Sequence, residues 1–195
     1  PPGLVANKKY SFHGVDPSGR GFTFDDRAKG AHPSEALDII LRDEPDYGAV
    51  VFPYIGGAEV NSSPTQEPRR SIICLQGLSL EEAQEKYPRF VELLQAVKVD
   101  RENRPKSAQA RYLSEKWWLW HSSRPALQAT LQQCERVIVN CQVSPNLAFV
   151  FQPSNRQFSL TLNVFAYDAF EKFAILQSRV HEIWARFFGS SLKDD

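Results

Sequence analysis

The last third of the chain carries the clearest alternation of apolar and polar side chains, and the pattern predicts three consecutive strands at 137–143, 147–151 and 158–164. In the first and third strands every second residue is apolar and most of the others are polar, which is typical of a strand with one buried face. The second is apolar throughout, so we expect it to be buried on both faces. Pro145 and Pro153 lie in the turn signals that separate the strands.

The polar positions of these strands allow two interpretations. In the first strand and the turn after it they are Asn140, Gln142 and Ser144, and in the third they include Thr161 and Asn163. A half-solvated antiparallel sheet exposes such side chains to water. Alternatively, these amides and hydroxyls form a surface that exchanges hydrogen bonds with a polar partner.

Helical spacing of apolar residues predicts helices at 34–41, 80–97 and 125–134. Ser79 opens a capping box before the second of these, and Pro88 predicts a kink or two abutting helices within it. The following tryptophan cluster is expected to be core, with base stacking as the alternative; its members are Trp117, Trp118 and Trp120.

The last predicted helix is long, begins at Asp168 and ends at Gly189. Its residues at three- and four-residue steps form one stripe, which we expect to lie across the apolar face of the three strands. The stripe consists of Phe170, Phe173, Ala174, Gln177, Val180, Trp184 and Phe187. The predicted fold is therefore α+β: twisted, mostly antiparallel or mixed sheets with packed helices, ending in a long amphipathic C-terminal helix.

The charge distribution is uneven although the net charge is zero. From 98 to 136 there are eight positive and four negative residues, which suits a one-sided contact with a polyanion, although such a run is also typical of a solvated face. Three cysteines without CxxC spacing indicate reduced thiols and a cytoplasmic location. No membrane segment is expected.

No motif of catalysis is complete. His181 and Glu182 begin an HExxH pattern, but Ala185 stands where the second histidine would be, so no metal site is expected. The glycines at 56–57 indicate a tight turn or a close approach of the backbone rather than a phosphate loop. The glycine-flanked Arg20, with Arg27 and Lys29 nearby, could reach a phosphate, but a flexible turn is the preferred interpretation. We expect no catalytic residues in this chain.

A series of short segments along the chain resembles a known family. The segments are 52–57, 61–64, 79–83, 87–88, 117–118, 124–127, 136–139, 147–151, 176–178, 181–186 and 188–193. They are similar to the target-recognition (specificity) domain of adenine-specific DNA methyltransferases. Those fused into single-chain type II restriction–modification enzymes are the most similar, including the MmeI-like and TaqI-like specificity domains. The resemblance covers roughly residues 45 to 195.

The resemblance implies a division of labour. A separate methyltransferase catalytic domain of the same polypeptide binds S-adenosylmethionine and flips the target adenine, while the recognition domain grips double-stranded DNA. This chain has neither the cofactor glycine motif nor Asn-Pro-Pro-Tyr, so by itself it is expected to be no enzyme and to bind no cofactor. Residues 1–195 are then one recognition domain, a fragment of a larger polypeptide that can also carry an endonuclease domain.

The resemblance, combined with the chemistry of groove recognition, points to two sets of residues. Amide side chains pair with adenine and arginine or lysine with guanine or phosphate. The expected base-reading residues are Gln142, Ser144, Asn146 and Asn140, and the expected phosphate contacts are Arg101, Arg104, Lys106, Arg111 and Arg124. The alternative function is a protein-interaction or scaffolding domain of the same enzyme with little direct DNA binding.

Overall fold

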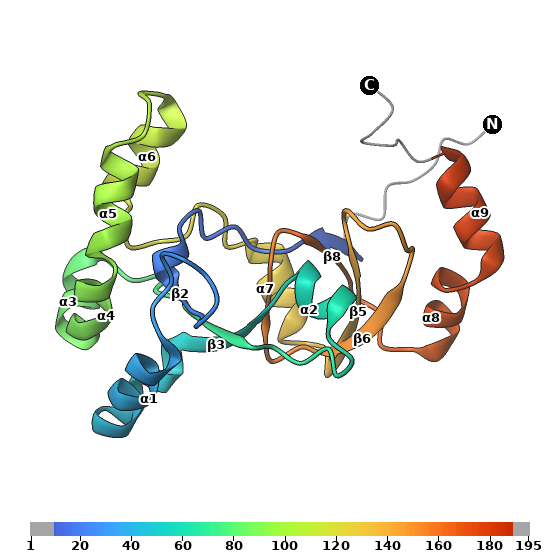
Figure 1. Ribbon diagram of the computed structural model, residues 1–195, viewed down its shortest axis with the longest axis horizontal. Helices are drawn as coiled ribbons and strands as arrows, with labels where there is room; N and C mark the ends of the chain where they lie inside the picture. Colours follow the sequence, from blue (N-terminus) through green and yellow to red (C-terminus); the bar gives the residue numbers. More distant parts are fainter. Residues whose placement is uncertain (1–9, 189–195) are drawn as a thin grey trace.

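Two four-stranded sheets occupy the centre of the computed structural model, which describes residues 10–188 (Figure 1). All strand pairs are antiparallel except β3 with β7, so the predicted α+β fold with mixed sheets is confirmed. The first sheet has the order β1 (Ser11–His13), β8 (Leu162–Phe165), β5 (Arg136–Cys141) and β6 (Phe149–Pro153). The second has the order β2 (Thr23–Phe24), β4 (Arg70–Ile73), β3 (Val51–Ile55) and β7 (Gln157–Phe158).

The third predicted strand, 158–164, is divided between the two sheets. Its start belongs to β7, which pairs with β3, and its end belongs to β8, which pairs with β5 and β1. A turn closed by the hydrogen bond from Leu162 N to Ser159 O (2.9 Å) separates the halves. Phe158 and Leu162 are both fully buried in one apolar cluster, so the alternation of apolar and polar residues continues across the turn. The turn therefore could not be recognised from the sequence pattern.

Most of the described chain outside the sheets is helical. The α-helices are α1 (Ser34–Asp43), α2 (Gly57–Ser62), α3 (Leu80–Lys86), α4 (Pro88–Leu93), α5 (Gln95–Glu102), α6 (Ala108–Glu115), α7 (Pro125–Leu131), α8 (Phe170–Leu176) and α9 (Arg179–Phe188), with 3₁₀ helices η1 (Arg20–Phe22) and η2 (Pro45–Val50). The predicted 80–97 helix is thus three abutting helices, with the first break before Pro88. The capping box is confirmed, because Ser79 Oγ accepts from Glu82 N (3.1 Å) and Glu82 Oε2 accepts from Ser79 N (2.8 Å).

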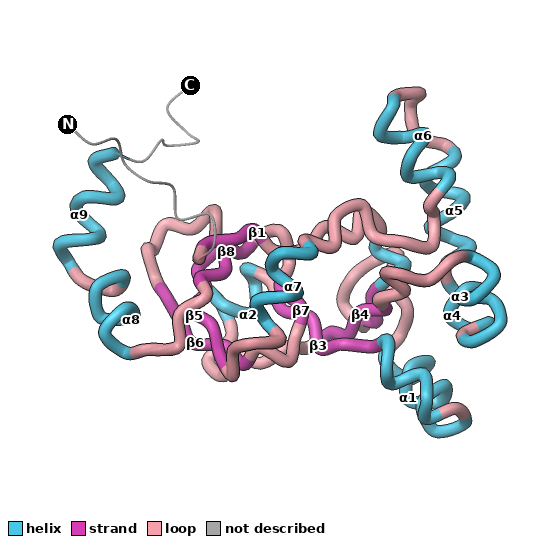
Figure 2. The backbone as a smooth tube through the Cα atoms, turned by 180° about the vertical axis from the view of Figure 1, so that it is seen from behind, coloured by secondary structure: helices cyan, strands magenta, loops and turns pink. Residues whose placement is uncertain are grey.

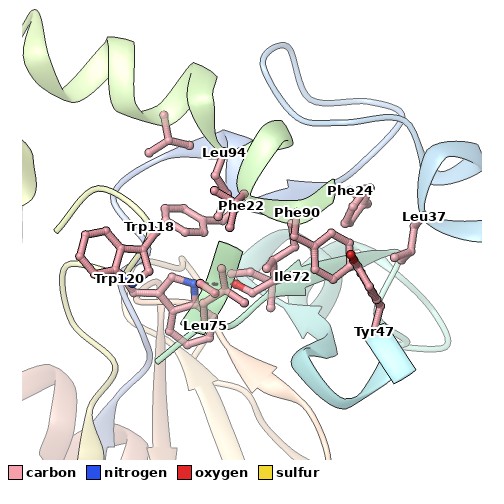
Figure 3. Packing of buried hydrophobic residues seen from close by; sticks show 14 of the residues in the cluster. Phe22, Phe24, Leu37, Tyr47, Ile72, Leu75, Phe90, Leu94, Trp118 and Trp120 are labelled. Atoms are coloured by element: carbon pink, nitrogen blue, oxygen red, sulfur yellow. Dashed lines mark hydrogen bonds between the residues drawn. The ribbon is translucent and has the colours of Figure 1, made fainter. Parts of the chain in front are cut away.

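An aromatic core joins the second sheet to the helices around it (Figure 3). Phe22, Phe24 and Phe90 are almost completely buried in it. The tryptophan cluster is part of this core, as expected: the indole N–H groups of Trp118 and Trp120 donate to the backbone oxygens of Leu78 (3.0 Å) and Ile73 (2.8 Å). These tryptophans are therefore not available for base stacking.

The first sheet is covered on both faces, by different helices from those expected. Val137 and Val139 pack in one apolar cluster with Leu127 and Leu131 of α7. The C-terminal segment packs on the opposite face, where Phe173 of α8 stacks on Phe151 of β6 with ring centroids 4.9 Å apart. The prediction that it crosses the valine face was wrong, because α7 already fills that face and β6 offers the rings of Phe149 and Phe151 on the other.

The long C-terminal helix is divided into α8 and α9 at Gln177 and Ser178. Ser178 is the reason for the break, since its Oγ accepts from His181 N (3.1 Å) in the manner of a helix N-cap. Several residues of the predicted stripe are more than half exposed, namely Phe170, Val180, Trp184 and Phe187. The predicted end at Gly189 lies outside the described residues.

The helical pairs α5–α6 and α8–α9 lie at opposite ends of the long axis, and both extend to the same side of the sheets (Figures 1 and 2). The loop between β5 and β6 rises on this side as well (Figure 1). Within residues 10–188, no helix combines the length and apolarity that a bilayer span requires.

Candidate nucleic-acid interface

The end of β5 carries the predicted base-reading residue Gln142 on a fixed backbone. Its N–H donates to Thr161 O (2.9 Å), which extends the ladder between β5 and β8 by one residue. Its side-chain Nε2 lies 2.6 Å from Leu160 O and 2.8 Å from His13 Nδ1. Gln142 is exposed, so its amide is both oriented by neighbours and accessible to a ligand.

The turn after Gln142 presents two more of the four predicted base readers, Ser144 and Asn146. Ser144 Oγ accepts a hydrogen bond from the backbone N–H of Asn146 (3.2 Å). The side-chain amide of Asn146 takes no part in this bond, and Asn146 is exposed. Arg186 of α9 donates to Pro145 O (3.1 Å) and so ties the turn to the C-terminal helix. The structure therefore brings Gln142, Ser144 and Asn146 together at one rim of the first sheet, the base-reader rim. Their role there remains a prediction.

Asn140 is not part of this rim. It is only 7% exposed, and its Oδ1 accepts from Asn163 Nδ2 (3.1 Å), the residue opposite it on β8. A base edge cannot reach a side chain in this position, so the base-reading role predicted for Asn140 was wrong. The half-buried Asn163 thus supplies a hydrogen-bond partner for the buried Asn140 amide, which is the usual requirement for a buried polar group.

Arg101 is the second residue that the structure removes from the predicted set. It is 1% exposed, and its guanidinium donates to backbone oxygens rather than facing solvent. The acceptors are Leu113, Lys116, Trp117 and Leu119 for Nη1 (3.5, 3.2, 3.1 and 2.8 Å) and Pro17 for Nη2 (2.7 Å). Burial, with a smaller contribution from nearby Arg104, lowers the pKa of Arg101 to about 10, so it remains charged at neutral pH. Its predicted phosphate contact was wrong, because a charge run in the sequence does not distinguish a solvated arginine from one that organises the interior.

The remaining predicted phosphate contacts lie on accessible surface. Lys106 and Arg111 are exposed at the α5–α6 end of the molecule. Arg104 is partly exposed and donates to Ser18 Oγ (2.8 Å) and Asp100 Oδ2 (2.8 Å). Arg124 is exposed but its Nε donates to Gly14 O (3.3 Å), so part of its guanidinium is engaged in holding the chain after β1.

A cleft of about 930 Å³ lies between the residues around η1, the start of β4 and α5, and it contains arginines that the sequence did not indicate as contacts. Arg20 and Arg27 line it together with Arg104 and with Arg70, which pairs with the buried Glu59 (2.9 Å). Asp16, Asp25 and Asp100 also line the cleft, so its charge is mixed. The sequence signal for this cleft was Arg20 between two glycines, with Arg27 nearby. The same spacing of arginine and glycine is equally typical of a flexible turn.

Leu160 connects this cleft to the base-reader rim. Its side chain lines the cleft, and its carbonyl oxygen accepts the Gln142 amide at 2.6 Å. The arginine-lined cleft and the base-reader rim are therefore neighbouring parts of one surface, although their residues are up to 130 positions apart in sequence, from Asp16 to Asn146.

Comparison with solved structures gives a match to "Structure of Type IIL restriction-modification enzyme MmeI in complex with DNA has implications for engineering of new specificities", with a TM-score of 0.69 and 17% sequence identity. It covers 94% of this chain and 22% of the MmeI chain. The fold is related to that of a restriction–modification enzyme. The chain spans about a fifth of the length of the MmeI chain that it matches. No protein-family model and no curated protein matches the sequence.

Reactive groups in the described part of the chain have environments that favour packing. Burial raises the pKa of the Cys74 and Cys141 thiols, which disfavours the thiolate that a nucleophile needs. Burial also lowers the pKa of His32. Residues 10–188 contain no group of three or more His, Cys, Asp or Glu side chains placed to hold a metal ion.

Proposed function

We propose that this chain is a DNA target-recognition domain that binds duplex DNA and positions a target adenine for methylation by a separate catalytic domain. The observation that carries the proposal is the fold, shared over 94% of the chain with part of a type IIL restriction–modification enzyme described in complex with DNA. S-adenosylmethionine would be bound by that catalytic domain, in the same polypeptide. The resemblance of the sequence to specificity domains supports the same assignment.

The surface supports a division between phosphate and base contacts. The base-reader rim offers the amide and hydroxyl groups that pair with base edges in the major groove. The cleft beside it and the α5–α6 end offer guanidinium and ammonium groups, which contact the backbone regardless of sequence. The loop between β5 and β6 rises on the side to which α6 and α9 extend, so a duplex on this side would meet both kinds of group (Figure 1).

The test is duplex binding by the chain across a salt series. Removing Lys106 and Arg111 together, as alanines, should weaken binding to all sequences and reduce the salt slope by about 2, since each lost phosphate contact reduces it by about 1. Gln142→Ala should instead alter the preference among sequences and leave the slope unchanged. Lys86→Ala, an exposed change on α3, is the matched control. Equal binding by all these variants, or no binding by the wild type at low salt, would count against the proposal.

A protein-interaction role within the same enzyme is the second candidate. Exposed apolar side chains on α9 favour it, since Val180, Trp184 and Phe187 are each more than half exposed. A chain with this role alone would show no duplex binding in the salt series.

A further inference from the structure

The hydrogen bonds around Gln142 determine which of its amide atoms a ligand meets. A carbonyl oxygen only accepts, so the Gln142 atom 2.6 Å from Leu160 O must be the amide nitrogen. The same nitrogen lies 2.8 Å from His13 Nδ1. Both hydrogens of the amide nitrogen are therefore used within the protein, and the group left for a ligand is the Oε1 acceptor.

The orientation of Gln142 in turn determines the tautomer of His13. Because Gln142 Nε2 donates, His13 Nδ1 must accept, and a neutral imidazole with an accepting Nδ1 carries its hydrogen on Nε2. Among the described residues, neither His13 Nε2 nor Gln142 Oε1 has a hydrogen-bond partner, and both residues are exposed. The pair thus offers a ligand one donor and one acceptor.

The sheet holds the two residues in this arrangement. His13 ends β1 and lies opposite Asn163 of β8, which in turn lies opposite Asn140 of β5. Opposite residues share a face, and Gln142 follows Asn140 by two positions, so all four side chains belong to one face. Asn140 and Asn163 bond to each other (3.1 Å), while His13 and Gln142 remain accessible.

We infer that His13 determines specificity by positioning Gln142 so that it presents only its Oε1 acceptor to a base, an inference that rests on the proposed DNA-binding function. In the major groove adenine presents the N6–H donor and cytosine the N4–H donor, and Oε1 can accept from either. Guanine presents two acceptors and thymine an acceptor, which Oε1 repels. A glutamine without these neighbours can contact adenine with both ends of its amide, but here the nitrogen end is occupied by Leu160 O and His13 Nδ1.

The test is selection from a duplex library with randomised positions, using the complete chain and reading the bound sequences. The wild type should select adenine or cytosine over guanine and thymine at one position of its site. Gln142→Ala and His13→Leu should each lower that preference about tenfold or more at the same position, the size expected from losing one base contact. Binding to a mixed-sequence duplex should change less than threefold in both variants.

His13→Asn is the matched rescue variant, because Asn Oδ1 takes the place of the accepting Nδ1 and keeps Gln142 oriented. It should therefore keep the wild-type preference against guanine and thymine. If Gln142→Ala removes the wild-type base preference but His13→Leu leaves it intact, the role of His13 is overturned and the proposed function stands. No duplex binding by the wild type would overturn both.

A second measurement is independent of DNA. The imidazole ¹⁵N shifts of His13 in the free chain should report the Nε2–H tautomer, and Gln142→Ala should shift the ring towards a mixture of tautomers. A predominant Nδ1–H tautomer in the wild type would contradict the hydrogen-bond arrangement on which the inference depends.

Discussion

Arg101→Met should lower the free energy of unfolding by roughly 3–5 kcal/mol, because each buried carbonyl left without a donor costs about 1–3 kcal/mol. The wild-type guanidinium lies within 3.5 Å of five carbonyl oxygens from three separate places, namely Pro17, the C-terminal part of α6 and the tryptophan segment. Nη1 carries only two hydrogens for four of them, and Lys116 O also accepts from Leu119 N (3.0 Å), so the variant leaves only some of these carbonyls without a donor. The methionine side chain fills much of the space but donates to none of them. Urea unfolding followed by tryptophan fluorescence measures the difference, and the melting temperature should fall by about 10 °C or more.

The control for this prediction is Lys106→Met, at an exposed position of the same basic segment, which should change the free energy of unfolding by less than about 0.5 kcal/mol. The opposite pattern, in which Arg101→Met leaves stability unchanged and weakens binding to all duplexes, would restore Arg101 as a phosphate contact.

Gly14→Ala should also be strongly destabilising, by about 3 kcal/mol or more, at the upper end of the cost of overpacking. A Cβ at this position would lie 2.1 Å from Ser159 O and 2.4 Å from Phe158 O, and both are backbone atoms that no side-chain rotation can move away. The segment links the two sheets, since Gly14 N donates to Leu162 O (3.1 Å) and Val15 N to Phe158 O (2.7 Å). His13 and Leu160 lie beside the clash, so any folded variant should also lose sequence preference.

Gly48→Ala is the matched control, because a Cβ there would meet only Leu41 Cδ2 at 4.0 Å. It should keep the free energy of unfolding within about 0.5 kcal/mol of the wild type. Thermal unfolding of both variants compares them directly, and equal melting temperatures would contradict the close backbone contact between the two sheets at Gly14.

Local patterns predicted those parts of the structure that depend on neighbouring residues. The alternation at 137–143 and the apolar run at 147–151 became β5 and β6, and the Ser79–Glu82 capping box begins α3. The base-reader rim also followed from local signals, since the alternation ends where the turn residues begin. Capping, turns and facial alternation are short-range effects, so they can be read from residues a few positions apart.

Pairings between distant segments could not be predicted in this way. The sequence pattern of 158–164 is the same whether one strand or two halves in different sheets produce it, and only the partners β3 and β5 separate the halves. The predicted C-terminal stripe has helical spacing, yet the face that receives α8 was decided by α7 filling the other.

The sequence by itself determined the α+β composition, the strands at the centre of the first sheet and the place where polar side chains leave it. Only the tertiary structure decided the fate of each polar group. Asn140 and Gln142 are two positions apart in the same pattern, but one is satisfied inside by Asn163 and the other is held at the surface by Leu160 and His13. Arg101 and Arg104 likewise share a basic segment, but only Arg101 is buried, among the backbone oxygens that accept from it. A polar side chain is buried where the fold supplies its hydrogen-bond partners, and here those partners come from remote segments of the chain.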